Sequence, residues 1–325
     1  MAEELTDLPT DADVYAAAGR IAPFVHRTPV LTSTSLDQES GARLFFKCEN
    51  FQVGGAFKAR GAFNAVLSLD AASAARGVET HSSGNHGAAL ALAAARRGIP
   101  AWVVVPTDAS VFKRNAIARY GAEVVDCAPG QTSREARLAR LVEESGATVV
   151  HPYDNAAVIA GQGTAAVELM EQAGPLDMLV APVGGGGLVS GCALAARANR
   201  PGVRVVAAEP AGADDCWQSL QSGHRVRLDQ VATIADGLRA SIGERNWALI
   251  SRHVDEVVRV ADDEIVAAMR LAWERLKIVI EPSAAVPLAA VCSGRLPVTG
   301  LRVGVIFSGG NLDLDGLPAL FSAIR

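Results

Sequence analysis

Short runs of consecutive apolar residues recur along the chain from about residue 83 onward, without the alternation of apolar and polar residues that marks a half-exposed strand. Strands buried on both faces have this pattern, and they are typical of parallel sheets that are covered by helices. The runs therefore predict buried parallel strands at residues 101–106, 122–127, 147–152, 177–183, 203–210 and 301–307.

Alanine-rich segments separate these runs, and their composition predicts helices. Residues 88–98 form one such segment. Residues 133–146 form another, in which Ser133 is a suitable N-cap and Gly146 a suitable stop. Helices that alternate with buried strands indicate an α/β fold built from doubly wound units.

A chain of 325 residues can hold two domains of ordinary size. The spacing of the predicted strands favours a small domain at residues 77–152, inserted in a large domain of residues 1–76 and 153–325. We therefore expect two doubly wound domains.

Composition and charge exclude several classes of function. With 50% hydrophobic and 20% charged residues, the composition is that of a globular protein. The net charge is -5 and the lysines and arginines are scattered, so the sequence shows no basic cluster that would bind nucleic acid. The longest apolar stretch is interrupted by Arg96 and Arg97, so we expect no membrane span. The acidic amino terminus resembles no targeting signal, which predicts a cytoplasmic protein. Five dispersed cysteines without CxxC spacing favour reduced thiols over disulfides or zinc.

The first motif that could take part in catalysis is VGGAFKARGAFNAV, in which Lys58 follows two glycines and begins a helical run. A lysine at a helix start is partly desolvated and near the positive end of the helix dipole, and both effects favour the neutral, nucleophilic amine. An ordinary surface lysine is the alternative.

The second motif is the polar loop THSSGNHG before the helix of residues 88–98. Its hydroxyls, amide, imidazole and backbone N–H groups at a helix amino terminus suit a carboxylate. A helix cap with a turn is the alternative.

The third motif is PVGGGGLVSG, which follows a predicted strand and opens a helix. Successive glycines let backbone N–H groups converge on a phosphate, and the helix dipole adds attraction. The motif does not fit the dinucleotide-binding pattern GxGxxG, which weakens the case for a dinucleotide site. It does not fit GxxxxGK[ST] either, which argues against a P-loop. A flexible turn is the alternative.

The fourth motif is IFSGGNLDL, in which a strand ends at Ser308. Ligands bind at the carboxyl ends of strands in doubly wound sheets, so this hydroxyl can point into a crevice. A plain strand-to-helix turn is the alternative.

Taken in this order, the four motifs resemble the fold-type II pyridoxal-phosphate enzymes, and within them the family of serine racemases and serine/threonine dehydratases, including 3-hydroxyaspartate dehydratases. The likeness covers nearly the whole chain. It implies a fold like that of the tryptophan synthase β-subunit, with pyridoxal 5'-phosphate in the cleft between the two domains and Lys58 holding it as a Schiff base. The other implied cofactor contacts are Phe57, Asn85, Gly184, Gly185, Gly186, Gly187 and Ser308.

The resemblance also implies a reaction. Loss of water from L-serine, L-threonine or threo-3-hydroxyaspartate, followed by release and hydrolysis of the resulting enamine, would give a 2-oxo acid and ammonia, with the freed Lys58 amine taking the Cα proton. Serine or aspartate racemisation is the alternative, with Lys58 and Ser83 as its two bases. The implied substrate contacts are His81, Ser82, Ser83, Asn85, His86, Arg134 and Ser241, of which an arginine suits a distal carboxylate. A homodimer is implied as well.

The segment EPAGADDC resembles the divalent-cation site of the same family. The resemblance implies Mg²⁺ or Ca²⁺ held by the Glu209 and Asp215 side chains and the Ala213 carbonyl, all hard oxygen ligands. Without that likeness, Asp214 and Asp215 would be taken as a helix cap.

The chain departs from the family pattern at Gly54, Gly55 and Ala56, where a Thr-Gly-Ser is usual. Two hydroxyls beside Lys58 are thereby missing, which bears on pocket polarity and substrate size. The sequence ends at Arg325 without a regulatory domain, so it resembles the degradative or racemase type.

Two other classes of protein fit the sequence less well. A nicotinamide dehydrogenase needs the GxGxxG that is missing here. A non-catalytic binding module could use the glycine run but has no need for Lys58.

Overall fold

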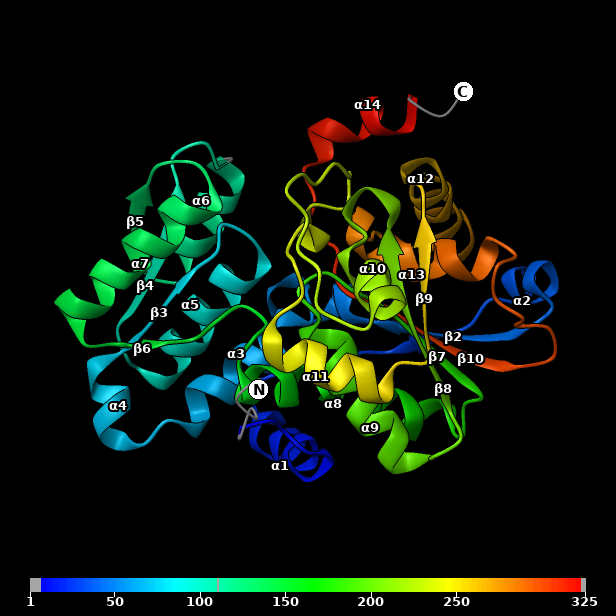
Figure 1. Cartoon of the computed structure of the whole chain (residues 1–325), viewed down its shortest axis with the longest axis horizontal. Coiled ribbons are helices and arrows are strands. Elements are labelled where there is room, and N and C mark those ends of the chain that lie inside the picture. Colours follow the sequence, from blue (N-terminus) through cyan, green and yellow to red (C-terminus); the bar gives the residue numbers. More distant parts are fainter. Residues whose placement is uncertain (1–6, 110, 323–325) are drawn as a thin grey trace.

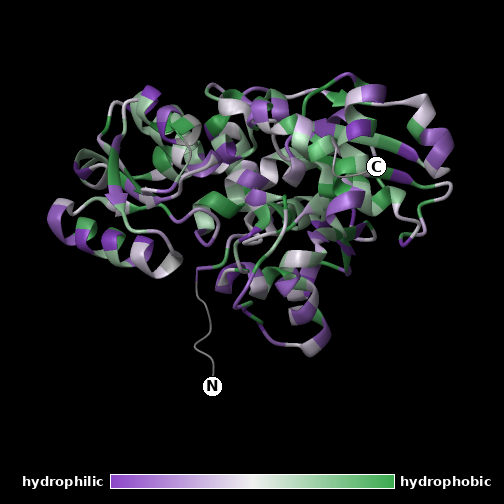
Figure 2. Cartoon of the chain, turned by 90° about the horizontal axis from the view of Figure 1, so that it is seen from above, coloured by the Kyte–Doolittle hydropathy of each residue, from purple (hydrophilic) through white to green (hydrophobic). Residues whose placement is uncertain are grey.

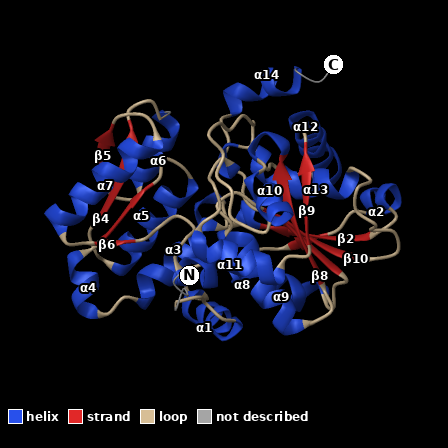
Figure 3. Ribbon diagram, viewed as in Figure 1, coloured by secondary structure: helices blue, strands red, loops and turns tan. Residues whose placement is uncertain are grey.

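The computed structural model describes residues 7–109 and 111–322, so residues 1–6 and 323–325 of the expected large domain lie outside the described residues. The strands form two separate sheets, each flanked by helices (Figures 1 and 3). The expected α/β class with two doubly wound units is confirmed.

The larger sheet has six strands, and only its edge strand β1 runs antiparallel to its neighbour. Their spatial order is β1 (Val30–Leu31), β2 (Arg43–Cys48), β10 (Arg302–Phe307), β7 (Met178–Pro182), β8 (Arg204–Pro210) and β9 (Glu256–Val260). The chain reaches β10 last yet places it between β2 and β7, so the end of this strand lies in the middle of the sheet.

The smaller sheet has four parallel strands, in the order β5 (Glu123–Cys127), β4 (Ala101–Pro106), β3 (Val78–His81) and β6 (Thr148–Val149). All four lie within the range expected for the inserted domain. Strand β6 is shorter than the apolar run of residues 147–152, because the chain leaves the sheet there and crosses back towards the larger unit.

Both faces of the larger sheet are covered, which explains its continuous apolar runs. One face packs against α2 (Thr34–Ser40), α12 (Asp262–Leu271) and α13 (Pro282–Cys292). The other face packs against α1 (Asp11–Ile21), α8 (Ala156–Ala173), α9 (Gly187–Asn199) and α11 (Glu244–His253). Neighbouring residues of one strand divide between the faces, as Phe45 and Phe46 do.

The smaller sheet is covered in the same way. Helices α3 (Lys58–Ser68) and α5 (Asn85–Arg97) share one core with its strands, while α7 (Gln131–Ser145) covers the other face. Helix α3 precedes residue 77, yet it packs in the core of the small unit and also against α8. It therefore joins the two units, and the exact domain limits remain a prediction.

The remaining helices lie at the periphery: α4 (Ala71–Arg76), α6 (Val111–Arg119), α10 (Asp215–Ser222) and α14 (Leu317–Ser322). A single turn of π-helix, Ala272–Leu276, follows α12. Strands such as β7 (MLVAP) and β10 (RVGVIF) consist mainly of hydrophobic residues, and Figure 2 colours the chain by this property.

Two helix starts differ from the expectation. Helix α5 begins at Asn85, three residues before the expected Ala88, so Asn85, His86 and Gly87 belong to the helix and not to the loop before it. Helix α7 begins at Gln131, two residues before Ser133, so Ser133 is not its N-cap. Its N-cap is Gly130, whose φ of 103° turns the chain into the helix in a way that other residues rarely can. The predicted stop is confirmed, because Gly146 ends the helix in the left-handed conformation.

Two further expectations can be checked. All five cysteines are described and are free thiols, and four of them are buried. Among the described residues, the helices are too short or too polar to cross a bilayer.

Candidate active site

A cavity of about 820 Å³ lies between the two sheets, and all four sequence motifs contribute to its lining. Its walls include Lys58 from α3, the loop before α5, the glycine run before α9 and Ser308 at the end of β10. These residues are far apart in the sequence and come together because parallel strands of both units end at this crevice.

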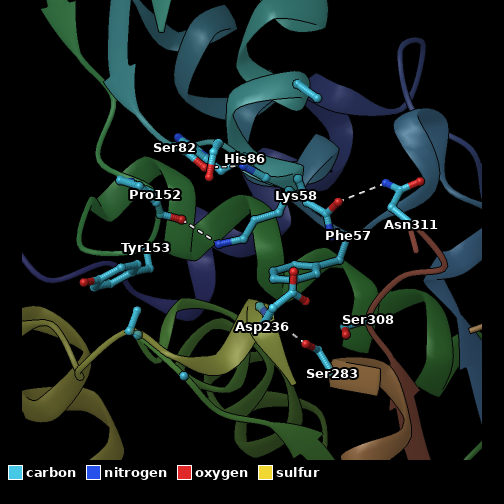
Figure 4. A pocket seen from close by; sticks show the side chains of 18 of the residues that line it. Phe57, Lys58, Ser82, His86, Pro152, Tyr153, Asp236, Ser283, Ser308 and Asn311 are labelled. Atoms are coloured by element: carbon cyan, nitrogen blue, oxygen red, sulfur yellow. Dashed lines mark hydrogen bonds between the residues drawn. The ribbon is translucent and has the colours of Figure 1, made fainter. Parts of the chain in front are cut away.

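Lys58 is the first residue of α3, as the sequence predicts. The preceding Phe57 donates its backbone N–H to the carbonyl of Ser308 at 2.9 Å, which ties the start of the helix to the end of β10. The Lys58 amine donates to the carbonyl of Pro152 at 2.8 Å, in the segment that returns from the small unit (Figure 4). Lys58 thus reaches across the cavity from one wall to another.

Burial lowers the pKa of Lys58 to about 8, and the nearby carboxylate of Glu281 opposes this shift. An ordinary lysine has a pKa near 10.4, so a much larger share of this amine is neutral at physiological pH. The neutral amine is the nucleophile that Schiff-base chemistry needs.

A buried cluster of charged side chains anchors the first turn of α3 to the large unit. The Arg60 guanidinium is fully buried and donates to both Glu49 oxygens, at 2.7 and 2.8 Å, and to both Glu168 oxygens, at 2.8 and 2.9 Å. Lys47, also fully buried, donates to the same Glu168 at 2.6 Å. Because Arg60 lies two residues after Lys58, this cluster holds the turn of helix that carries the reactive amine.

The glycine run lines the cavity and then begins α9. Gly186 is the N-cap and makes no side-chain capping bond, so the first N–H groups of the helix are left for another acceptor. A Cβ at Gly185 would lie 2.3 Å from the Tyr153 ring, so a side chain cannot be placed there without moving that ring or the loop. The loop therefore fits an anion such as a phosphate.

Asn85 lies in a hydrogen-bond network that is not evident from the sequence. Its side-chain N–H group donates to the two Glu281 oxygens at 3.1 and 3.2 Å, and its carbonyl oxygen accepts from Asn311 at 3.0 Å. Glu281 is buried and immediately precedes α13. Only the Glu-Pro pair at that helix start could have drawn attention to it, and such pairs are common at helix starts.

The loop of residues 82–84 and the first turn of α5 form a second possible anion site at the amino terminus of a helix. Helix α5 begins at Asn85, and its N-cap Gly84 makes no side-chain capping bond. Ser82, Ser83, Asn85 and His86 all line the cavity, as expected for substrate contacts.

The imidazole of His86 is buried, and its Nε2 donates to the carbonyl of Val150 at 3.0 Å. This leaves Nδ1 as an acceptor without a partner, and burial holds the pKa of the ring well below its usual value. A neutral ring in this tautomer cannot donate to a carboxylate. His86 can therefore contribute only its backbone N–H.

His81 and Arg134 also line the cavity, from the end of β3 and the first turns of α7. Burial and the charge of Arg134 lower the pKa of His81. Ser241 is not part of the cavity lining, whereas the preceding Ala240 is. Several further lining residues were not expected from the sequence, among them Arg119, Tyr153, Asp236, Arg239 and Asn311.

The residues expected to hold a cation lie outside this lining. The Glu209 oxygens accept from two backbone N–H groups at the start of α10, at 3.0 and 2.9 Å. The Asp215 carboxylate accepts from the backbone N–H of Ile242 at 2.8 Å. Burial raises the pKa of both carboxyl groups, so a cation would offset the cost of their ionised forms. Within the described residues no three His, Cys, Asp or Glu side chains gather as a metal site.

Residues 21–309 match the family of pyridoxal-phosphate dependent enzymes. The chain belongs to this family. It is 50% identical over 311 residues to the β-hydroxyaspartate dehydratase of Paracoccus denitrificans, covering 96% of this chain and 99% of that protein. It is also 50% identical over 317 residues to the serine racemase of Arabidopsis thaliana, covering 96% of each.

The structure of maize serine racemase superposes with a TM-score of 0.93 at 45% identity, covering 97% of this chain and 98% of that one. This confirms the expected fold. Within the family, the chain belongs to the fold-type II group that includes serine racemases, threonine dehydratases and hydroxyaspartate dehydratases. Because identity to a dehydratase and to a racemase is equal, the comparisons support a dehydratase or a racemase.

Proposed function

We propose that this protein eliminates water from a small 3-hydroxy amino acid and releases an enamine that is hydrolysed to a 2-oxo acid and ammonia, with Lys58 as the residue that holds pyridoxal phosphate. The observation that supports this proposal most directly is that three features line the same cavity. These are a lysine amine with a lowered pKa, an uncapped glycine loop and an uncapped helix start.

The residues present fit the cofactor. The N–H groups between Gly184 and Gly187 would hold its phosphate, and the Ser308 hydroxyl would meet its ring nitrogen as a neutral partner. When bound, pyridoxal phosphate supplies an electron sink for the pair left at Cα after proton removal. The phenyl ring of Phe57, whose centroid lies 5.1 Å from the Lys58 amine, gives the cavity an apolar wall beside the reactive nitrogen.

The first turn of α5 would bind the substrate α-carboxylate. Backbone N–H groups of Asn85 and His86 lie at this helix start, where the dipole favours an anion. Ser82 and Ser83 supply hydroxyls beside them. This arrangement would orient Cα towards the Lys58 side of the cavity.

Lys58 would act as the base. Once freed, an amine with a pKa of about 8 can accept the Cα proton near neutral pH, because its proton affinity matches the working range of a general base. A second base is needed only for racemisation, and Ser83 lines the same cavity. Racemisation by Lys58 and Ser83 is therefore the second candidate function, and it is supported by the equal identity to serine racemase.

A divalent cation, Mg²⁺ or Ca²⁺, would be held by Glu209, Asp215 and the Ala213 carbonyl. Two buried carboxylates with raised pKa values support this placement. The cation would lie outside the cavity lining, so its role would be to stabilise the fold and not to take part in the reaction. A homodimer is proposed from the family likeness alone.

The test uses the purified chain with added pyridoxal phosphate. A visible absorbance band that borohydride abolishes is expected for the wild type and not for Lys58→Ala. A colourless wild-type protein would refute the cofactor assignment. Incubation with L-serine, L-threonine and L-threo-3-hydroxyaspartate, with 2-oxo acid and D-isomer both measured, should give 2-oxo acid as the main product. A D-isomer in excess of 2-oxo acid would favour the second candidate function.

A further inference from the structure

The charged groups that line the cavity are mostly cationic. They are Lys58, Arg119, Arg134, Arg239, Asp236 and Glu281. Arg239 already donates two N–H groups to the carbonyl of Thr233. Glu281 accepts from Asn85. Arg239 therefore uses two of its five N–H donors on the protein, whereas Arg134 uses one, in a 3.4 Å contact with the Gly130 carbonyl. Arg119 and Arg134 are the guanidinium groups with the most donors to offer a ligand.

Arg119 is presented to the cavity by its helix. Asn115, Ala116, Arg119 and Tyr120 all line the cavity, and positions separated by four residues lie on one face of a helix. Arg114, on the same helix, is not part of the lining and forms an ion pair with Asp126 at 2.6 Å. Helix α6 therefore turns one arginine towards the cavity and pairs the other outside it.

Neither Arg119 nor Arg134 is neutralised by an ion pair within the described part of the chain. No ion pair joins Arg119 or Arg134 to a carboxylate of the described residues, and the Arg134 Nε makes only a 3.4 Å contact with the Gly130 carbonyl. Arg137, one turn further along α7, is paired with Glu144. Unpaired guanidinium donors that face one cavity are what a planar anion uses in bidentate binding.

A monocarboxylic substrate leaves these donors unused. The start of α5 serves the α-carboxylate, and the start of α9 serves the cofactor phosphate, so both expected anions already have partners. Arg119 belongs to α6 and Arg134 to α7, and both helices are part of the small unit. Their unused donors indicate a second carboxylate on the substrate.

We infer that Arg119 is a specificity-determining residue that binds, together with Arg134, the distal carboxylate of a dicarboxylic 3-hydroxy amino acid. The inference rests on the proposed function and narrows its substrate class to four-carbon compounds such as threo-3-hydroxyaspartate. A purely structural role for Arg119, at the carboxyl end of the helix dipole, makes a different prediction, because it would not distinguish between substrates.

Binding of inert acids tests the inference without turnover. Succinate and butyrate both have four carbons and no amine, and they differ in the second carboxylate. Calorimetry on the holoenzyme should show succinate weakened about 10- to 100-fold by Arg119→Gln, as expected for lost hydrogen bonds to a charged group. Butyrate should change by less than about threefold. Arg114→Gln is the matched control and should leave both acids unchanged.

Steady-state kinetics supply the second measurement. Arg119→Gln should lower kcat/KM for L-threo-3-hydroxyaspartate about 10- to 100-fold, with a change of less than about threefold for L-serine. Equal losses for both substrates, or no change in succinate binding, would overturn the inference. If the wild type makes no 2-oxo acid from either substrate, the proposed function fails. The succinate comparison would still decide whether Arg119 binds a second carboxylate.

Discussion

The pH dependence of cofactor capture by the apoprotein follows from the position of Lys58. Burial lowers the pKa of this amine to about 8, while the carboxylate of Glu281 partly opposes the shift. Only the neutral amine attacks an aldehyde, so the rate of capture should rise with pH and level off above the pKa of Lys58. Replacing Glu281 with glutamine removes the opposing charge, and the midpoint should therefore move to lower pH.

The size of the effect can be worked out from this pKa. At pH 7.5 an amine with a pKa of about 8 is roughly one-quarter neutral, whereas a lysine near 10.5 is about one part in a thousand neutral. The cavity thus raises the reactive fraction roughly 200-fold at that pH. Because glutamine keeps an acceptor for Asn85, Glu281→Gln changes the charge beside Lys58 while retaining that hydrogen bond.

The assay is stopped-flow mixing of the apoprotein with pyridoxal phosphate between pH 6.5 and 10.5, followed by the visible absorbance. The aldehyde has protonation steps of its own, and comparing wild type with Glu281→Gln under identical conditions removes them. Arg27→Gln, at an exposed residue, serves as the unaffected control. A wild-type midpoint near that of free lysine would refute the reasoning. So would a Glu281→Gln midpoint that stays in place or rises.

Three further predictions address stability, cofactor binding and the choice of reaction. Arg60→Met should lower the free energy of unfolding by about 3–5 kcal/mol, because it leaves the buried carboxylate of Glu49 without its ion-pair partner, while Glu168 keeps Lys47. Arg27→Met, in an exposed pair, should lower it by about 1 kcal/mol or less, and urea denaturation measures both changes. Gly185→Ala should weaken cofactor affinity in fluorescence titration, because its Cβ would overlap the ring of Tyr153, and a Gly185→Ala, Tyr153→Ala double variant that recovers no affinity would contradict this cause. Ser83→Ala should abolish any D-isomer formation while retaining 2-oxo acid formation, and equal loss of both products would count against a two-base mechanism.

The local pattern of residues was enough to predict much of the architecture. Apolar runs without alternation marked strands such as 101–106 and 301–307, because burial on both faces leaves no polar positions. Glycine runs and helix starts are likewise local features, so Lys58 and the Gly184 to Gly187 loop could be proposed from neighbouring residues alone. The start of α7 was misplaced, because a glycine with positive φ took the place of the expected serine cap.

The remaining features of the site depended on long-range contacts. Asn85 and Glu281 meet across 196 positions of sequence, and no local pattern reports such a pair. Arg119 faces the cavity, and Ala240 lines it in place of Ser241, because of how α6 and the loop after η4 (Asp236–Leu238) sit against the sheets. The sequence by itself determined the class of fold and the chemical groups. Only the tertiary structure decided which of them share one cavity, since that depends on the order in which distant strands pair.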